Sequence, residues 1–535
     1  MATSTLIEVF GQIVYRLTRS VTEHYNPEEP EFTTESFGYD PLLSTGREWY
    51  KEPVDELIYQ EYSDREATNS NFFAHNINVQ VINAFLPEDS GETRVDQNVK
   101  EEGMAWKRLR PSFPQTVCKS MCFGALISFL AAMLIAMVYL QISFVSYKTI
   151  LQCQDYNISS IPIRVQWIKT ISDAISVSFY YFWIFVTLLF LFRPYQLKGI
   201  KKKLILVSFV AYCLDISYRF SLQAIGKPYY ASATELQIPI YACCITSICL
   251  QLYIVGRQFC PRPRLTGLLC KMIVPFCLPL ISGMFFSDIL YRTYLKQKDT
   301  GRLIIALFSP LLGVALKVIS RICVQRLWNI THPGYSYVLL APLYYCSAII
   351  FRALQADLDH LRTIAILGVI HGVAEVIERS IMALVDHVLH VLWKKKLAPW
   401  GSFRTPRRER LMADIIILSM LSESVAVVYV NGLRYLHDFV FVGNNSIIWL
   451  LKTFAVHTSV QLVIEWFFTS VSLAIETRYQ NVAVMAVWRR KWKRHILLAL
   501  VNTFPIAVWN SFCLLVLFRA RYKEVLNQPC KMPFT

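Results

Sequence analysis

The stretch MCFGALISFLAAMLIAMVYLQISFVS, residues 121–146, contains no charged side chain and decides the fold class. An α-helix rises about 1.5 Å per residue, so roughly 20 residues cross the hydrocarbon core of a bilayer, which is about 30 Å thick. A helix over residues 121–146 is therefore long enough to span a membrane. We predict that this stretch is the first transmembrane helix of the chain.

Further apolar stretches follow as far as residue 518. The second ends at residue 192, and nine more are expected at about 204–222, 238–255, 268–291, 303–322, 337–354, 363–393, 411–433, 447–474 and 496–518. The composition agrees, because 17% of the residues are charged, against about 25% in soluble domains. The sequence predicts an all-α fold, that of a polytopic helical membrane protein with 10 or 11 transmembrane helices. The lipid bilayer is therefore its expected partner.

The charge of the connectors predicts the orientation of these helices. Lysine and arginine gather ahead of the first helix, at residues 105–113, and in later connectors at 193–203, 257–264, 393–410 and 476–495. Positively charged connectors mark the cytoplasmic face of a membrane. We therefore expect a cytosolic N-terminus and, with eleven spans, a C-terminus on the opposite side. Residues 292–302 are the exception, since they are basic on the predicted outer side.

The outer connectors predict two kinds of covalent modification. Asn157 and Asn444 begin Asn-X-Ser sequons that fall outside in this topology, so we expect both to be glycosylated. Of the 14 cysteines, Cys153 and Cys530 are the two predicted outside, where an oxidising lumen would allow a disulfide between them. Glycosylation implies the secretory route and a location in the plasma membrane or an endolysosomal membrane.

We divide the chain into three regions: an acidic cytosolic region at 1–116, a helical bundle at 117–520 and a short tail at 521–535. Charge separates the first region from the rest. The first region holds 20 acidic and 10 basic residues, whereas the rest of the chain holds 18 acidic and 44 basic residues. The basic groups lie in short connectors beside apolar stretches, so we expect them to meet lipid headgroups and not nucleic acid.

The region at 1–116 is expected to be partly disordered and to offer a surface for a cytosolic protein partner. Its first 20 residues place apolar side chains at helical spacing, which predicts a helix that lies on the membrane or docks onto the bundle. Residues 38–42, Gly-Tyr-Asp-Pro-Leu, match a tyrosine-based sorting signal, and an ordinary loop is the competing interpretation.

Two helices carry the same acid–base pattern near their predicted outer ends. Asp215 and Arg219 lie in one copy of D-I-x-Y-R, and Asp288 and Arg292 lie in the other. Residues four apart share a helix face, so each pair can neutralise itself. Either the pairs line an outward vestibule, or they are salt bridges that hold helices together. We favour salt bridges.

The stretch HGVAEVIERSIMALVDHVLH, residues 371–390, is unusually polar for a membrane helix. Its ionisable residues recur at spacings of three and four, so they form a stripe along one helix face. They are His371, Glu375, Glu378, Arg379, Asp386 and His390. His387 lies one turn before His390, and His371 lies one turn before Glu375. Three interpretations compete: a transport path, a metal site that uses the one-turn pairs of His and Glu, and a buried structural network.

Other isolated polar residues would meet this stripe if their helices pack together. They are Arg352, Asp414, Glu423, His457 and Glu465. Ionisable groups at membrane depth are costly and normally face a partner or water. We take as transport-path candidates His371, Glu375, Glu378, Arg379, Asp386, Glu423, His457 and Glu465.

The sequence carries no catalytic motif of the metalloprotease, hydrolase, P-loop or dinucleotide-binding kind, so no cofactor or resident metal is expected, and a lipid-modifying membrane enzyme is the least supported of three functional hypotheses. The leading hypothesis is a transport protein, a channel or a carrier, whose polar path lies in the later helices. The alternative is a membrane receptor or scaffold that binds partners through its N-terminal region and uses its buried charges only for structure.

Overall fold

A computed structural model describes the helical body of the chain and a short N-terminal segment. The described residues are 9–14, 113–149, 163–192, 197–226, 236, 238–259, 262–327, 331, 335–356, 358, 361–394, 406–437, 439, 446–480, 482 and 484–521. The prediction of an all-α fold is confirmed for these residues, which contain no strand.

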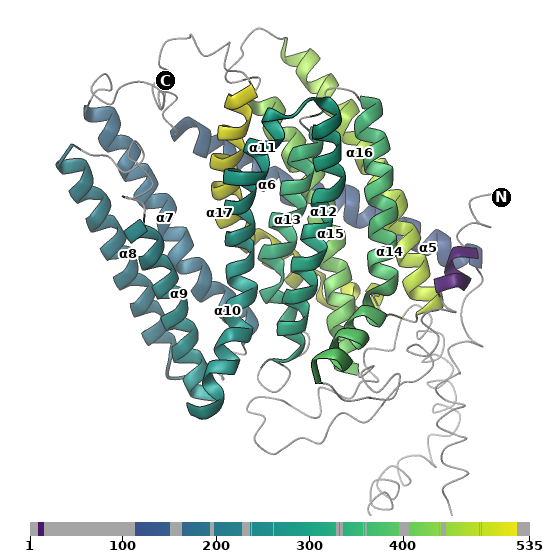
Figure 1. Ribbon diagram of the computed structural model, residues 1–535, viewed down its shortest axis with the longest axis horizontal. Coiled ribbons are helices and arrows are strands. Elements are labelled where there is room, and N and C mark those ends of the chain that lie inside the picture. Colours follow the sequence, from purple (N-terminus) through teal and green to yellow (C-terminus); the bar gives the residue numbers. More distant parts are fainter. Residues whose placement is uncertain are drawn as a thin grey trace, which may run out of the picture.

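The body is a bundle of long helices (Figure 1). The first runs without interruption from α5 (Phe113–Ala125) through the π-helical η3 (Leu126–Ala131) into α6 (Ala132–Thr149). Then come α7 (Ile163–Leu191), α8 (Lys201–Ala224), α9 (Ile238–Phe259), α10 (Arg262–Phe285) with η7 (Phe286–Leu290) and α11 (Tyr291–Lys296), and α12 (Asp299–Gln325). The chain continues through η8 (Ser336–Leu339), α13 (Ala341–Ala356), α14 (Leu361–Lys394), α15 (Pro406–His437), α16 (Ile447–Tyr479) and α17 (Val484–Arg521).

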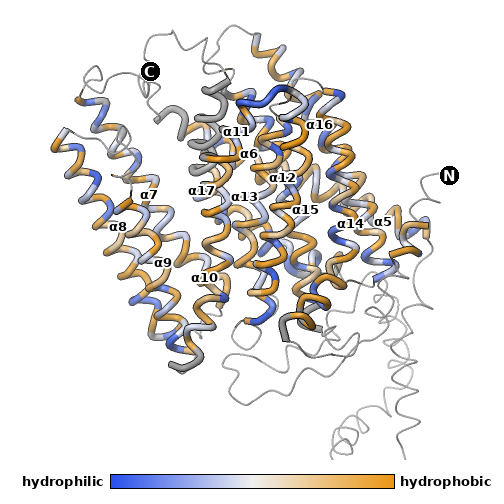
Figure 2. Tube along the Cα trace, viewed as in Figure 1, coloured by the Kyte–Doolittle hydropathy of each residue, from blue (hydrophilic) through white to orange (hydrophobic). Residues whose placement is uncertain are grey.

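Eight of the described helices are long and apolar enough to cross a membrane. They are the α5–α6 helix, α7, α8, α9, α10, α12, α15 and α16. Apolar residues dominate along most of the bundle (Figure 2), and large apolar side chains such as Leu134, Leu206 and Leu311 are exposed on its outside. Exposed apolar surface on so many helices is compatible with a multi-pass membrane protein.

The centre of the bundle is α15. It packs against α6, α13, α16 and α17, and 94% of its most apolar window is buried inside the protein, against 22–39% for the other seven candidate spans. Helices α7, α8 and α9 form one side of the bundle, at the left of Figure 1. The fold therefore encloses α15 and the shorter α13, in which every residue except Phe351 is buried, within a periphery with apolar outer faces.

The structure corrects the predicted connector at 476–495. Helix α16 extends to Tyr479 and α17 already begins at Val484, so nearly all of the expected connector is helical. The reason is that apolar Val484, Val487 and Trp488 are buried between the basic residues and give this segment a face that packs on the core. The first helix likewise begins at Phe113, ahead of the predicted boundary at 117.

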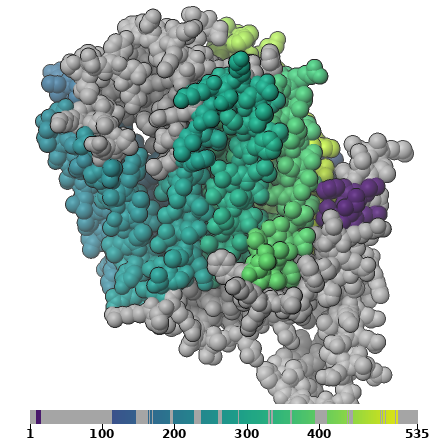
Figure 3. Space-filling model, in the orientation of Figure 1, coloured from purple at the N-terminus to yellow at the C-terminus, as the bar shows by residue number. Residues whose placement is uncertain are grey.

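The N-terminal segment docks onto the bundle. Residues 9–14 are helical, and Val14 packs with Val376 of α14 and with Ile475 and Tyr479 of α16. Gly11 permits the close approach, because a Cβ atom there would lie 2.2 Å from the ring of Tyr479. Figure 3 shows this segment in purple at the edge of the bundle. Of the two predicted positions for an N-terminal helix, the structure has the docked one.

A glycine also sets the distance between α14 and α16. A Cβ atom on Gly372 would lie 2.2 Å from the ring of Phe468, which is far inside van der Waals contact. We expect Gly372→Ala to lower the free energy of unfolding by about 1–3 kcal/mol, the usual cost of overpacking. Thermal unfolding of the detergent-solubilised protein measures this change.

The matched control is Gly267→Ala, which adds the same methyl group to α10 where nothing lies within 4 Å. Because alanine is the better helix former, this variant should be unchanged or more stable by up to about 1 kcal/mol. Equal stability of the two variants would contradict the close packing of α14 on α16.

Candidate functional site

Ten ionisable side chains meet where α12, α13, α14, α15 and α16 pack together, and we call this cluster the charged seam. Its basic members are Lys317, Arg321, Arg352 and Arg379, and its acidic members are Glu375, Glu378, Asp386, Glu423, Glu465 and Glu476. Helix α14 contributes the largest share, because its acidic residues and Arg379 recur every three or four positions and so face the same neighbours.

Arg352 of α13 joins two carboxylates from different helices. Its Nη2 lies 2.5 Å from Glu465 of α16 and 3.5 Å from Glu423 of α15. Glu423 in turn lies 3.9 Å from Nζ of Lys317 in α12, which also rests 5.0 Å from the ring centre of Tyr344. All four ionisable side chains are largely buried, so this chain of contacts connects four helices away from water.

Arg379 makes the most regular contact of the seam. Its Nε and Nη2 each donate a hydrogen bond of 2.8 Å to the two carboxylate oxygens of Glu476, and its Nη1 lies 3.5 Å from Glu375 one turn earlier in α14. A two-pronged arginine–carboxylate pair is both stronger and more directional than a single contact. It fixes α14 against α16.

Asp386 closes the seam against α12. Its carboxylate accepts hydrogen bonds from Nη2 of Arg321 at 3.2 Å and from Nε2 of Gln325 at 2.6 Å. Glu378, two turns earlier, interacts electrostatically with both Lys317 and Arg321. The carboxylates of Glu375, Glu378 and Asp386 therefore lie on the side of α14 that faces α12.

The two histidines among the transport-path candidates lie in different parts of the bundle. His371 is at one end of the seam, where its Nδ1 lies 3.3 Å from Nε2 of Gln355, and the side-chain oxygen of Gln355 accepts a hydrogen bond from Arg352. His457 is outside the seam, because its Nδ1 instead pairs with the hydroxyl of Tyr435 at 2.9 Å. The structure thus brings seven of the eight path candidates together and leaves His457 apart.

Asp414 belongs to a second buried cluster. Its carboxylate lies 2.9 Å from Nε of Arg410 and 3.0 Å from Nε2 of His495, whose ring stacks on Tyr337 with centres 4.6 Å apart. Asp414 and Glu423 are nine residues apart on α15, about 14 Å along the helix. We had expected Asp414 to meet the α14 stripe, and the structure places it elsewhere.

The first acid–base copy forms the expected salt bridge. Asp215 lies 2.5 Å from Nε of Arg219, and its other oxygen accepts a hydrogen bond from the hydroxyl of Tyr181. The pair is buried and connects α8 to α7, as a salt bridge between helices would. In the second copy, the side chains of Asp288 and Arg292 lie outside what the structure describes. The described residues also do not include the predicted glycosylation sites, Asn157 and Asn444, or the cysteines of the predicted disulfide, Cys153 and Cys530.

Sequence reasoning missed three members of the seam or gave them another meaning. Lys317 and Arg321 lie within the expected apolar span 303–322 and were not singled out, and Glu476 lies in the expected connector 476–495. A signal was present, since Lys317, Arg321 and Gln325 follow each other at spacings of four on α12. Glu476 lies 11 residues after Glu465, about three helical turns, and so shares its face.

The charge balance of the seam is unequal. Six carboxylates stand against four basic side chains, so full ionisation would leave a net charge of minus two. Unbalanced charge away from water is unfavourable, and protons or bound cations are the means of neutralising it. Within the described helices no three His, Cys, Asp or Glu side chains are arranged to hold a metal ion.

Comparisons with known proteins leave the site to be interpreted from its geometry. No family model, no curated protein and no solved structure matches this chain.

Proposed function

We propose that this chain is a multi-pass membrane transport protein in which cations, protons included, move along the charged seam. The observation that carries the proposal is the excess of carboxylates over basic groups in a buried cluster. Two negative charges remain to be neutralised, and a cation that enters the seam would neutralise them. Buried ionisable groups within membrane helices commonly mark such pathways.

The length of the seam supports the same proposal. From His371 to Asp386, α14 rises by about 22 Å, which is most of the roughly 30 Å hydrocarbon thickness. A purely local salt bridge needs only one turn of helix. A polar stripe of this length connects regions near the two membrane surfaces, as a transport path must.

The apolar side of α14 supports its insertion as a span despite its charges. Ile366, Val369, Ile370, Val373 and Ile377 are exposed and recur at helical spacing, so the outward face of α14 is apolar. With α13, α14 and α17 included, the proposed topology has eleven spans. The basic connectors favour a cytosolic N-terminus in this topology.

Arg352 is the proposed switch of the path. A cation that binds Glu465 competes with Arg352, and the guanidinium then moves to its second partner, Glu423, which already lies within 3.5 Å. The two pairings are alternative arrangements of the same four helices. A cation gradient can drive an exchange between them, because it changes their relative free energies.

Glu378→Gln is the variant that tests this function. Glu378 interacts electrostatically with Lys317 and Arg321, and glutamine has nearly the same size and shape as glutamate, so this variant removes a seam charge with little loss of packing. We expect at least a tenfold loss of cation flux into liposomes that contain the purified protein. Fluxes of protons, sodium and potassium are followed separately, each under an imposed gradient.

The matched control is Asp215→Asn, which removes a buried, ion-paired carboxylate outside the seam. This variant should transport as well as the unmodified protein once equal amounts are reconstituted. Absence of cation flux through the unmodified protein would overturn the proposal. Equal flux through the Glu378→Gln and unmodified proteins would remove the seam from the path.

A further inference from the structure

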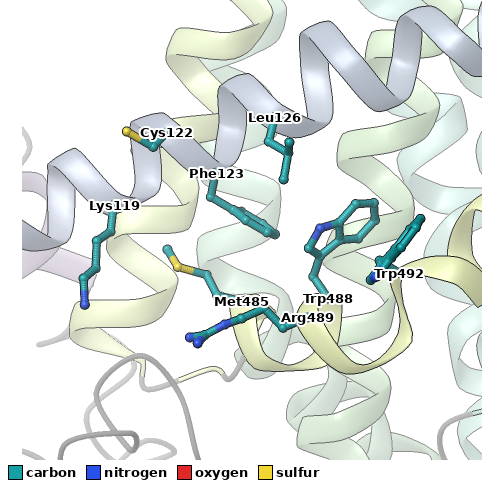
Figure 4. A pocket seen from close by; sticks show the side chains of 8 residues that line it. All are labelled: Lys119, Cys122, Phe123, Leu126, Met485, Trp488, Arg489 and Trp492. Atoms are coloured by element: carbon teal, nitrogen blue, oxygen red, sulfur yellow. The ribbon is translucent and has the colours of Figure 1, made fainter.

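A groove lies between the beginning of the first helix and the beginning of the last, away from the charged seam. It encloses about 650 Å³ (Figure 4). Its walls come from α5 and α17, and they are formed by Lys119, Cys122, Phe123, Leu126, Met485, Trp488, Arg489 and Trp492. The groove residues on α17 come before residue 496, where the last transmembrane helix was expected to begin.

The groove is divided into a basic end and an apolar end. Lys119 and Arg489 are both exposed and reach toward the same side in Figure 4, whereas Leu126, Trp488 and Trp492 line the other side. The basic groups come from two different helices. A ligand that used both would bridge the start of α5 and the start of α17.

The apolar wall is held in a fixed position. Trp488 is buried and packs edge to face on Phe123, with ring centres 6.0 Å apart. Trp492, one turn further along α17, remains 42% exposed and presents its ring to the outside. A rigid aromatic wall with an open side accommodates a flexible apolar chain without rearrangement.

These features together define the chemistry of the ligand. An inorganic anion could contact Lys119 and Arg489 but would leave the tryptophan wall exposed, and a neutral lipid would cover the wall without using the two positive charges. Tryptophan beside lysine and arginine is typical of the membrane–water interface, where basic groups attract anionic lipids. Arg490, Lys491 and Lys493 follow in the same segment of sequence and add to the positive charge.

We propose that this groove binds one anionic phospholipid. The headgroup phosphate lies between Lys119 and Arg489, and an acyl chain runs along Leu126 and Trp492. In the topology proposed above, both helices begin at the cytosolic surface, which is the leaflet that carries anionic lipids. The site connects the first and last helices of the bundle, and it does not depend on transport.

Native mass spectrometry of the full-length protein in detergent tests the site. The probes are phosphatidylserine and phosphatidylcholine with identical acyl chains, titrated separately. We expect phosphatidylserine to bind at least tenfold more tightly, and the double variant Lys119→Gln/Arg489→Gln to lose this preference. The control is Lys202→Gln/Lys203→Gln, which removes two exposed charges from the start of α8. It should leave the preference intact.

A second variant separates the apolar contact from the charges. Trp492→Ala keeps both basic groups and, because its ring is partly exposed, should fold normally while it weakens binding of phosphatidylserine several-fold. Soluble glycerophosphoserine should compete poorly, since it has no acyl chain. Equal binding of the two lipids, an equal loss in the α8 control, or full competition by glycerophosphoserine would each overturn the proposal.

Discussion

Arg352→Gln will lower the free energy of unfolding by about 3–5 kcal/mol, the usual cost of removing one partner from a buried ion pair. Arg352 contacts both Glu465 and Glu423, and all three side chains are largely buried. Its loss leaves two carboxylates with Lys317 as the remaining close base, 3.9 Å from one of them. Chemical or thermal unfolding in detergent measures the change.

A double variant shows whether this contact serves structure alone. Arg352→Gln combined with Glu465→Gln removes both charges, so most of the lost stability should return. Cation flux should remain low, because both the proposed switch and its main carboxylate are gone. A double variant that recovers both stability and flux would make the pair purely structural. One that recovers no stability would contradict the contact itself.

Reversing the charge of Arg379 has the second large effect. Arg379→Glu would place a third carboxylate beside Glu476 and Glu375, within the distances now occupied by the two-pronged pair. Like charges that are buried together destabilise strongly. We expect little or no folded protein, measured as the monodisperse fraction on size-exclusion chromatography.

The compensating variant Arg379→Glu/Glu476→Arg restores opposite charges across the α14–α16 contact. We expect it to recover a substantial part of the folded fraction, although the arginine now starts from a different backbone position. The control Glu476→Arg alone should be as defective as Arg379→Glu, because it brings two guanidinium groups together. No recovery in the double variant would argue that these two helices are not neighbours.

The sequence was sufficient where the relevant residues share one helix. The stripe from His371 to Asp386 could be recognised because spacings of three and four define a single face before any neighbour is known. The Asp215–Arg219 pair could be recognised for the same reason. Hydrocarbon thickness predicted long apolar helices in a similar way, and eight of the eleven expected spans are long and apolar enough to cross a membrane.

The partners across helices could not be obtained in this way. The spacing puts Glu476 on the same helix face as Glu465, but it does not show that Glu476 reaches Arg379 or that His457 turns to Tyr435, because both contacts depend on the rotation of α16 against its neighbours. Asp414 was misplaced because two residues on one helix can lie at different depths and join different clusters. Packing decides these choices, and packing involves residues far apart in the chain.

The enclosure of α15 has a consequence for biogenesis. Helices α6 and α13 are synthesised before α15, and α16 and α17 after it, so in a bilayer the faces of a nascent α15 that await α16 and α17 would first meet lipid tails. It exchanges those lipids for protein only when the remaining segments arrive. Completion of the bundle therefore comes late in translation, and a chain truncated before α16 would leave its most central helix exposed to quality control.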